Sequence, residues 1–244
     1  MNTWNTQWKN QWKKTLALGC AAFLLGGSAW GYAAPTVTAA SSAPHAANPQ
    51  DAPMPLPLTE EEVSAQQLAD AQYMALLWMR TSAEYRALCY QGYNAALMAI
   101  DRAQANPAAR SGKPLAIVLD CDETVTDNTR AMAAAAAAGN GRYDALWWRA
   151  TVHEARSEAM PGAAEFLNEV ARRGVAIFYV SNRWSEVNYE PTIENLKALG
   201  FPSVDAEHVL LMEDRKMSDK QPRFDQIAKN YDVVVYMGDN AGDL

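Results

Sequence analysis

The sequence predicts an α/β fold in which helices cover a doubly wound parallel sheet. Apolar runs at 115–119, 175–180, 209–212 and 233–237 are separated by stretches with helical spacing. Strands that alternate with helices in this way predict a parallel sheet. A polar cluster follows each run. Because ligands of such sheets bind at the carboxyl ends of the strands, these clusters predict a single site.

The run at 115–119 is apolar throughout, which predicts a strand buried on both faces. It is followed directly by Asp120 and Asp122. Two carboxylates at the end of a buried strand are costly unless they find a partner, and a hard cation such as Mg²⁺ prefers oxygen ligands. One of them can instead serve as a nucleophile, since aspartate forms aspartyl-phosphate. An Asp-rich turn without a ligand is the simpler alternative.

Residues 1–33 are predicted to be a secretory signal peptide. Residues 1–50 contain no Asp or Glu, a basic stretch carries Lys9, Lys13 and Lys14, and an apolar stretch follows. Its apolar core is shorter than the roughly 20 residues that span a bilayer. We therefore expect an exported protein, in the periplasm or associated with the outer membrane.

An uncleaved N-terminal anchor is an alternative to the signal peptide. Lipid attachment at Cys20 is another, which fits poorly because the apolar stretch mostly follows Cys20. Residues 34–58 are rich in Pro and Ala and are predicted to form a disordered linker.

The overall composition limits which classes of binding partner are expected. The 244 residues carry a formal net charge of −7, so a nucleic-acid polymer is not expected as a partner, whereas a small phosphorylated substrate is compatible with a local positive charge. Three cysteines give neither a disulfide framework nor a zinc pattern. The oligomeric state does not follow from the sequence.

The first helices are expected at 59–79 and 82–105. A capping box at Thr59 and Glu62 predicts the start of the first. Both are expected to pack on the sheet. Further helices are expected at 161–173, 192–199 and 222–230, between the later strands.

Residues at about 129–159 interrupt the alternation and predict a small helical cap over the carboxyl ends of the strands. The cap carries Trp147 and Trp148. These side chains can belong to the core, or one can stack on a ring or base of a substrate, because aromatic faces stack well on bases.

The polar clusters together contain the groups that phosphoryl transfer needs. Such a reaction uses a nucleophile in line with phosphorus, an acid and base, and positive charge and donors around the phosphate oxygens. Crowded carboxylates repel one another, which favours a divalent cation. The candidate residues are Asp120, Asp122, Ser181, Asn182, Lys220, Asp239 and Asp243.

The motifs Asp120-Cys-Asp-Glu-Thr124, Ser181-Asn-Arg183, Lys220 and Gly238-Asp-Asn-Ala-Gly-Asp243 resemble the four signature motifs of the haloacid dehalogenase superfamily. More narrowly, the chain resembles the class C bacterial acid phosphatases, which include 5′-nucleotidase-type outer-membrane lipoproteins. Stretches 77–88, 122–128 and 160–166 support the narrower resemblance. Four motifs in the right order at strand ends are far more specific than any one alone.

The resemblance implies a role for each residue. Asp120 is the nucleophile and an Mg²⁺ ligand, and Asp122 is the general acid and base that offers Mg²⁺ its backbone carbonyl. Ser181, Asn182 and Lys220 hold the phosphate. Asp239 is a metal ligand and Asp243 supports the metal shell. Trp148 is the implied contact for a nucleoside.

By the same resemblance, residues 59–244 form the phosphatase domain and the fold is haloacid dehalogenase-like. Members of the family continue beyond the position of Leu244 with more helix and loop, so we expect the chain to be truncated there. The implied activity is Mg²⁺-dependent hydrolysis of phosphate monoesters such as nucleoside 5′-monophosphates. A non-catalytic nucleotide- or phosphate-binding surface protein, or a phosphotransferase, are the alternatives.

Overall fold

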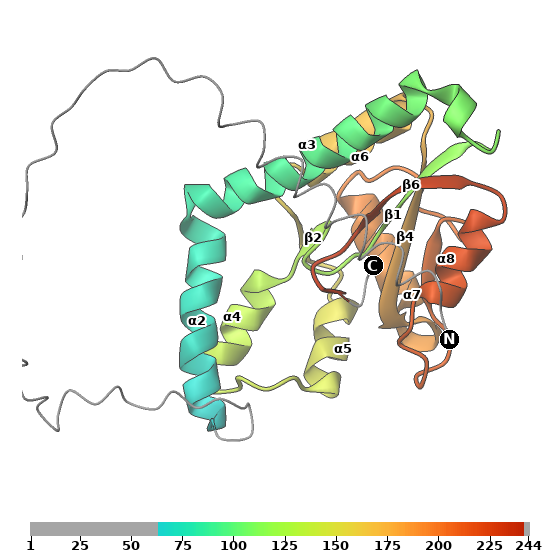
Figure 1. The fold of residues 1–244 in the computed structure, drawn as a ribbon. Helices are drawn as coiled ribbons and strands as arrows, with labels where there is room; N and C mark the ends of the chain where they lie inside the picture. Colours follow the sequence, from blue (N-terminus) through green and yellow to red (C-terminus); the bar gives the residue numbers. More distant parts are fainter. Residues whose placement is uncertain (1–62, 242–244) are drawn as a thin grey trace, which may run out of the picture. The chain divides into compact units, whose positions relative to one another are not determined.

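The computed structural model describes residues 63–241 of the chain. Its centre is a four-stranded, all-parallel sheet in the order β5-β4-β1-β6 (Figure 1). The strands are β1 (Leu115–Leu119), β4 (Ala176–Trp184), β5 (Val209–Met212) and β6 (Asp232–Met237). This confirms the predicted parallel α/β sheet, and the four predicted apolar runs are its four strands.

Helices cover both faces of this sheet. On one face lie α3 (Ala83–Ala105), α6 (Ala163–Arg172) and α7 (Ser185–Ala198), and on the other lies α8 (Gln221–Ala228). A single turn of 3-10 helix, η3 (Pro107–Ala109), links α3 toward β1. Helices on both faces are what a parallel sheet with buried strands requires, because each face must be removed from water.

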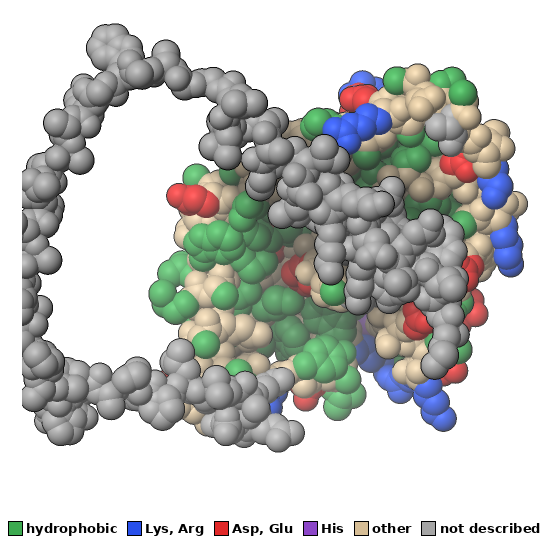
Figure 2. Space-filling model, viewed as in Figure 1, with side chains coloured by type: hydrophobic (Ala, Val, Ile, Leu, Met, Phe, Trp, Pro, Cys, Tyr) green, Lys and Arg blue, Asp and Glu red, His purple; other side chains and the backbone are tan. Residues whose placement is uncertain are grey.

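Three more helices stand beside the sheet: α2 (Ala65–Thr81), α4 (Thr129–Ala137) and α5 (Ala145–His153). Helices α2 and α4 share a small apolar cluster of their own, formed by Ala69, Leu76 and Ala136. Figure 2 shows hydrophobic side chains gathered over this part of the molecule. The prediction that the first helix packs on the sheet is therefore wrong, because its apolar residues are used against α4.

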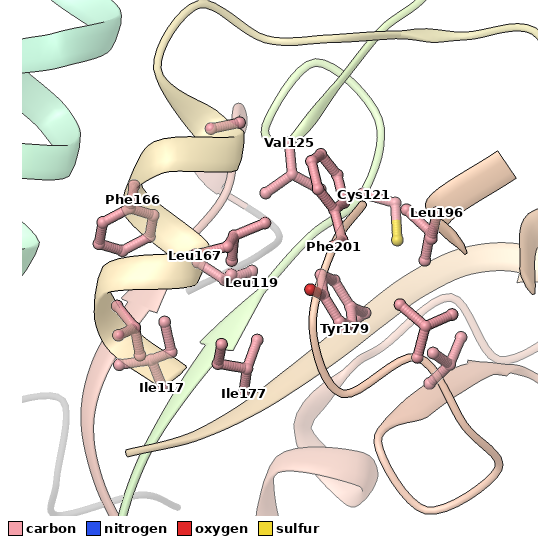
Figure 3. Packing of buried hydrophobic residues seen from close by; sticks show 14 of the residues in the cluster. Ile117, Leu119, Cys121, Val125, Phe166, Leu167, Ile177, Tyr179, Leu196 and Phe201 are labelled. Atoms are coloured by element: carbon pink, nitrogen blue, oxygen red, sulfur yellow. The ribbon is translucent and has the colours of Figure 1, made fainter. Parts of the chain in front are cut away.

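The main core lies between β1, β4 and the helices α3, α6 and α7 (Figure 3). Side chains alternate along each strand, so Ile117 and Leu119 point into this core while Ala116 and Val118 face α8. All five residues of β1 are buried. The strand that precedes Asp120 is therefore held on both sides, which fixes the position of the residue that follows it.

The structure adds a feature that the sequence did not predict. A short antiparallel pair, β2 (Thr126–Asp127) and β3 (Glu158–Ala159), joins the two ends of the segment that carries α4 and α5. Helix α5, in the second half of the predicted cap, ends at His153. Two-residue strands lack a periodicity that a sequence pattern can reveal.

Several boundaries also differ. The first helix begins at Ala65, with a capping box formed by Ser64 and Gln67, while Thr59 and Glu62 lie outside the described residues. Helix α7 begins at Ser185 and contains Pro191, whereas the expected start was 192. None of the helices in the described part of the chain is long and apolar enough to cross a bilayer.

Candidate active site

Residues from the ends of the strands and from the cap line one cavity of about 510 Å³. This volume is in the range of small-molecule sites, which is roughly 300–1,000 Å³. The lining residues are Gln72, Asp120, Asp122, Glu123, Met132, Ala135, Asn140, Arg142, Tyr143, Trp147, Trp148, Ser181, Asn182, Arg183, Lys220, Asp239 and Asn240. The structure thus brings together all the predicted site residues except Asp243, which lies outside the described residues.

Asp120 is the first residue after β1 and is 8% exposed. Its backbone N–H donates to the carbonyl of Met237 at 2.9 Å, which ties it to the end of β6. Lys220 Nζ lies 2.6 Å from Asp120 Oδ1, and the Lys220 side chain is 2% exposed. A charged pair in such a buried position is short and strong, and it fixes where the carboxylate points.

Lys220 reaches Asp120 from the start of α8, where it occupies the cap position. The two residues are a hundred positions apart in the chain. Their meeting depends on the order of the strands, because α8 lies between β5 and β6 in sequence but packs on the face of β1 and β4.

Asp122 lies in a tight loop whose donors point at the backbone carbonyl of Cys121. The backbone N–H groups of Val125 and Thr126 both donate to this oxygen at 2.9 Å, as does the Thr126 hydroxyl. Glu123 in the same loop has φ of 52°, a backbone conformation that costs a non-glycine residue energy. The loop is therefore shaped by hydrogen bonds that hold one residue in a strained conformation.

The carboxylate of Asp122 is bound by Arg183, a residue for which the sequence analysis predicted no role. Arg183 Nε donates to Asp122 Oδ2 at 3.0 Å and its Nη2 to Oδ1 at 2.6 Å, a bidentate pair. Asn128 Nδ2 also donates to Oδ1, at 2.8 Å. Arg183 is itself held by Thr192 Oγ1 at 3.0 Å. Burial alone would lower the pKa of Arg183, but the charge and hydrogen bonds of Asp122 raise it overall.

A break in strand register explains how Arg183 is aimed. Ser181 of β4 pairs with Leu211, and the next paired residue is Trp184, opposite Met212. Asn182 and Arg183 lie between these two positions as a bulge, and bulges near active sites redirect side chains. Arg183 is consequently buried while Asn182 is exposed. The prediction that the strand ends before Ser181 is wrong for this reason.

Ser181 and Asn182 are both tied to Arg223 of α8. Arg223 Nη1 donates to the carbonyl of Ser181 at 2.7 Å and its Nη2 to Asn182 Oδ1 at 2.6 Å. Asn182 Nδ2 in turn donates to the carbonyl of Ser218 at 2.8 Å. The amide of Asn182 therefore connects β4 to the loop before Lys220, in addition to lining the cavity.

Acidic side chains follow β1 and β6, where the sequence predicts a metal site. Asp239 follows β6, next to the end of β1. Burial, and then the charge of Asp122, raise the pKa of Glu123 to about 8, with a further contribution from Asp239. Carboxylate oxygens from two neighbouring strands are the kind of donor that Mg²⁺ prefers. Among residues 63–241, however, no group of three or more His, Cys, Asp or Glu side chains is already arranged to hold a metal ion.

The cap supplies the opposite wall. The rings of Trp147 and Trp148 of α5 have centroids 5.9 Å apart. Asp144 caps this helix, because its Oδ1 accepts from the backbone N–H of Trp147 at 2.7 Å. The sequence did not predict that α2 contributes Gln72, or that the loop before α5 contributes Asn140 and Arg142. A recognisable signal for the loop is its pair of glycines, which flank Asn140.

Comparison with known proteins agrees with this geometry. Residues 39–244 match the family described as HAD superfamily, subfamily IIIB (Acid phosphatase). The structure is similar to that of the class C acid phosphatase from Bacillus anthracis, with a TM-score of 0.65 and 38% sequence identity over 72% of each chain. A second structure of that enzyme, with tungstate bound, matches equally well. The chain therefore belongs to subfamily IIIB of the HAD superfamily and is an acid phosphatase, a hydrolase of phosphoric monoesters.

Proposed function

We propose that this acid phosphatase is an exported, Mg²⁺-dependent enzyme that hydrolyses nucleoside 5′-monophosphates and similar small esters through a phosphorylated Asp120. The observation that carries the proposal is the buried pair of Asp120 and Lys220, 2.6 Å apart, on the cavity wall. A nucleophile and a cation held together in this way suit an incoming phosphate. The binding of tungstate, a phosphate-like ion, by the Bacillus anthracis enzyme supports the same class of substrate.

Asp120 attacks phosphorus in the proposed first step, and the bond between phosphorus and the ester oxygen breaks. Asp122 gives its proton to the leaving oxygen. In the second step Asp122 takes a proton from water, which attacks the phosphorus of phospho-Asp120 and releases phosphate. Each step needs its groups in fixed positions, and phosphoryl transfer depends almost entirely on positioning and charge stabilisation.

The contacts of Asp122 hold its carboxylate in a fixed position, as a general base requires. Arg183 and Asn128 hold both oxygens of its carboxylate, so the side chain faces the cavity in one orientation. The carboxylate nevertheless keeps some exposure, 19% of the side chain, which leaves a path for the proton. Lys220 and the Ser181 hydroxyl are the proposed partners of the phosphate oxygens.

Mg²⁺ would be held by the carboxylates of Asp120 and Asp239 and by the backbone carbonyl of Asp122, with Asp243 as a further proposed ligand. The hard oxygen donors and the negative charge around Glu123 fit such a cation. When bound, the ion offsets the negative charge of the phosphate and the carboxylates.

The aromatic wall supports a nucleoside as the leaving group. Trp148 and Trp147 line the cavity together with Tyr143. Stacking of a base on an aromatic side chain contributes about 1–3 kcal/mol and accepts any base. This favours a broad preference among nucleotides over recognition of one base.

The decisive test is hydrolysis of an aryl phosphate with Mg²⁺ at mildly acid pH. We expect Asp120→Asn to lose activity by about 10⁴-fold or more, because the attacking oxygen is gone. Asp225→Asn, an exposed carboxylate on α8, is the matched control and should retain full activity. Equal rates for wild type and Asp120→Asn would refute the mechanism.

Two alternatives give different results in related assays. Calorimetry that detects nucleotide binding by the wild type without turnover would favour a non-catalytic binding protein. Transfer of phosphate to an added alcohol, in place of water, would favour a phosphotransferase.

The proposed export rests on residues 1–33. Fusion of this segment to a reporter that is active only outside the cytoplasm should produce signal, and Lys9, Lys13 and Lys14 changed to Glu should reduce it. Mass spectrometry of the exported chain then distinguishes a cleaved signal from an uncleaved anchor or a lipid on Cys20.

A further inference from the structure

Helix α7 buries a face that is largely polar. Its buried residues include Asn188, Thr192 and Asn195, which are 5, 0 and 3% exposed. Residues three and four positions apart lie on the same face of a helix, so these side chains share one face. A buried polar group costs free energy unless it is hydrogen-bonded. The hydrogen bonds that this face makes therefore show what it is for.

Asn195 binds the backbone of Ser157, the residue directly before β3. The Asn195 Oδ1 accepts from the Ser157 N–H at 3.1 Å, and the Asn195 Nδ2 donates to the Ser157 carbonyl at 3.0 Å. One side-chain amide thus pairs with both backbone groups of one residue. Because Ser157 lies at the end of the segment that carries α4 and α5, this pair ties the end of the cap to α7.

From Ser157 the hydrogen bonds continue to Asp122. The Ser157 hydroxyl donates to Asn128 Oδ1 at 2.6 Å, and Asn128 Nδ2 donates to Asp122 Oδ1 at 2.8 Å. Asn128 is 2% exposed and occupies the N-cap position of α4, yet its side chain makes no capping bond to that helix. An N-cap asparagine ordinarily accepts from the first turn of its helix. Here the side chain binds Asp122 and Ser157 instead.

We propose that Asn128, Ser157 and Asn195, which we call the cap clamp, are positioning residues that orient Asp122 relative to the cap. The inference rests on the proposed function, because it takes Asp122 as the acid and base of the reaction. The cavity that residues 63–241 form is not lined by any of these three side chains. They therefore act on the reaction through Asp122 and not by touching the substrate.

The cap clamp also selects the oxygen of Asp122 that carries the proton. Each oxygen of a carboxylate has two lone pairs. Those of Oδ1 are taken by Arg183 Nη2 at 2.6 Å and by Asn128 Nδ2 at 2.8 Å. The Thr126 hydroxyl, 3.5 Å from Oδ1, donates to the carbonyl of Cys121. Oδ2 accepts from Arg183 Nε and keeps one lone pair, so the proton for the leaving oxygen is expected there.

A second chain of contacts reaches the same face of α7. Arg183, which binds both oxygens of Asp122, donates from its Nη1 to Thr192 Oγ1 at 3.0 Å. Thr192 and Asn195 lie on one face, so a single turn of α7 supports Asp122 by two routes. The route through Arg183 avoids the cap, whereas the route through the cap clamp includes both ends of it. A shift of the cap against α7 therefore disturbs the orientation of Asp122.

The leaving group of the substrate separates a positioning role from a purely structural one. Methoxide is a strong base that leaves phosphorus only when an acid protonates it, whereas nitrophenolate is a weak base that needs little protonation. A misplaced Asp122 therefore slows the hydrolysis of methyl phosphate far more than that of nitrophenyl phosphate. The quantity to compare is kcat/KM, because it includes the step in which the leaving group departs.

The test is kcat/KM for both esters at saturating Mg²⁺. We expect Asn195→Ala and Ser157→Ala to lower it about 10- to 100-fold for methyl phosphate and about twofold at most for nitrophenyl phosphate. Ser157→Ala keeps the backbone pair with Asn195, so it remains informative if Asn195→Ala does not fold. Ser157→Thr keeps a hydroxyl and should behave like the wild type.

Asn188→Ala is the matched control. It removes a buried asparagine from the same face of α7, whose Oδ1 accepts no hydrogen bond within the described part of the chain. The ratio of the two kcat/KM values should stay that of the wild type. A ratio that Asn188→Ala changes as strongly as Ser157→Ala would mean that any disturbance of α7 has this effect, which overturns the inference.

Asp122→Asn separates a failure of this inference from a failure of the proposed function. If it affects both esters equally, Asp122 is not the acid, and the proposed function and the inference fail together. If Asp122→Asn is selective but Ser157→Ala and Asn195→Ala slow both esters equally, the cap clamp supports only the fold. If those two variants change neither rate, Arg183 alone positions Asp122. Each of the last two results overturns the inference and leaves the proposed mechanism in place.

Discussion

Two regions of the molecule meet at the cavity and are built in different ways. The carboxyl ends of β1 and β4 present Asp120, Ser181 and Arg183, all of them buried and held by strands whose two faces are covered. The cap side presents Trp147, Trp148 and Gln72 from α5 and α2, where α2 buries only Ala69 and Leu76. The difference separates two tasks. In the proposed mechanism the reacting groups follow buried strands, whereas the groups proposed to meet the variable part of a substrate lie on helices that bury fewer residues.

After the loss expected for Asp120→Asn, the largest effect is expected on the strand side, at Lys220. Lys220→Met keeps the length of the side chain but removes the charge that lies 2.6 Å from Asp120. We expect kcat to fall about 10³-fold, as when a preorganised group that stabilises developing charge is removed. Steady-state kinetics with a small phosphate ester measures the loss. Lys216→Met, at an exposed position in the preceding loop, should change little.

Arg183→Met tests how much the contacts on the strand side contribute to folding stability. The variant leaves Asp122 without its bidentate partner, and breaking a buried pair costs about 3 kcal/mol of folding stability or more. Denaturant unfolding measures the loss. Arg173→Met removes two ion pairs nearer the surface, with Asp101 and Glu169, and should cost much less. Equal losses for the two variants would contradict the comparison.

The raised pKa of Glu123 is expected to make the free energy of unfolding depend on pH. Its folded pKa of about 8 exceeds its ordinary value of 4.5, so between these values the folded state binds more protons than the unfolded state. Stability is therefore fully present below about pH 4.5 and is lost as the pH rises to about 8. The loss is on the order of 2 kcal/mol, since solvent screens part of the charge.

Unfolding measured with a chelator present, so that no cation shifts the pKa, should show this slope in the wild type. Glu123→Gln should flatten it. A slope that persists unchanged in Glu123→Gln would mean that other groups carry the pH dependence.

Gly141→Ala tests the packing of the cap side. An added Cβ would lie 2.3 Å from the Ala69 backbone nitrogen and 2.6 Å from the Leu68 carbonyl carbon, which are backbone atoms of α2. Overpacking of this kind costs about 1–3 kcal/mol. Thermal unfolding measures it. Gly92→Ala, inside α3 with no atom near the new Cβ, should instead raise stability by about 0.5–1 kcal/mol.

The smallest effect is expected at Trp148. Trp148→Ala should raise KM for a nucleoside 5′-monophosphate by about tenfold, because a stacking contact of about 1–3 kcal/mol is lost. Hydrolysis of methyl phosphate, which has no ring to stack, serves as the control and should be unaffected. A loss of the same size for both substrates would assign Trp148 to the cap structure and not to the nucleoside.

Part of this site was predictable from the sequence. The apolar runs identified all four strands, and the polar residues after them identified Asp120, Asp122, Lys220 and Asp239 as neighbours in one cavity. Arg183 stands inside one of the quoted motifs, yet its contact with Asp122 was missed because a bulge in β4 turns it inward. Gln72 was missed because nothing local in α2 relates it to a cavity formed by residues far along the chain.

The sequence by itself determined the four strands of the main sheet and the helices that alternate with them, because the spacing of apolar residues records how many faces of a segment are buried. It also determined that carboxylates and a lysine follow strands. Only the tertiary structure decided that Arg183 binds the carboxylate of Asp122 and that α2 packs on α4. These pairings depend on strand order, on register and on which helices meet, none of which is encoded by any single stretch of residues.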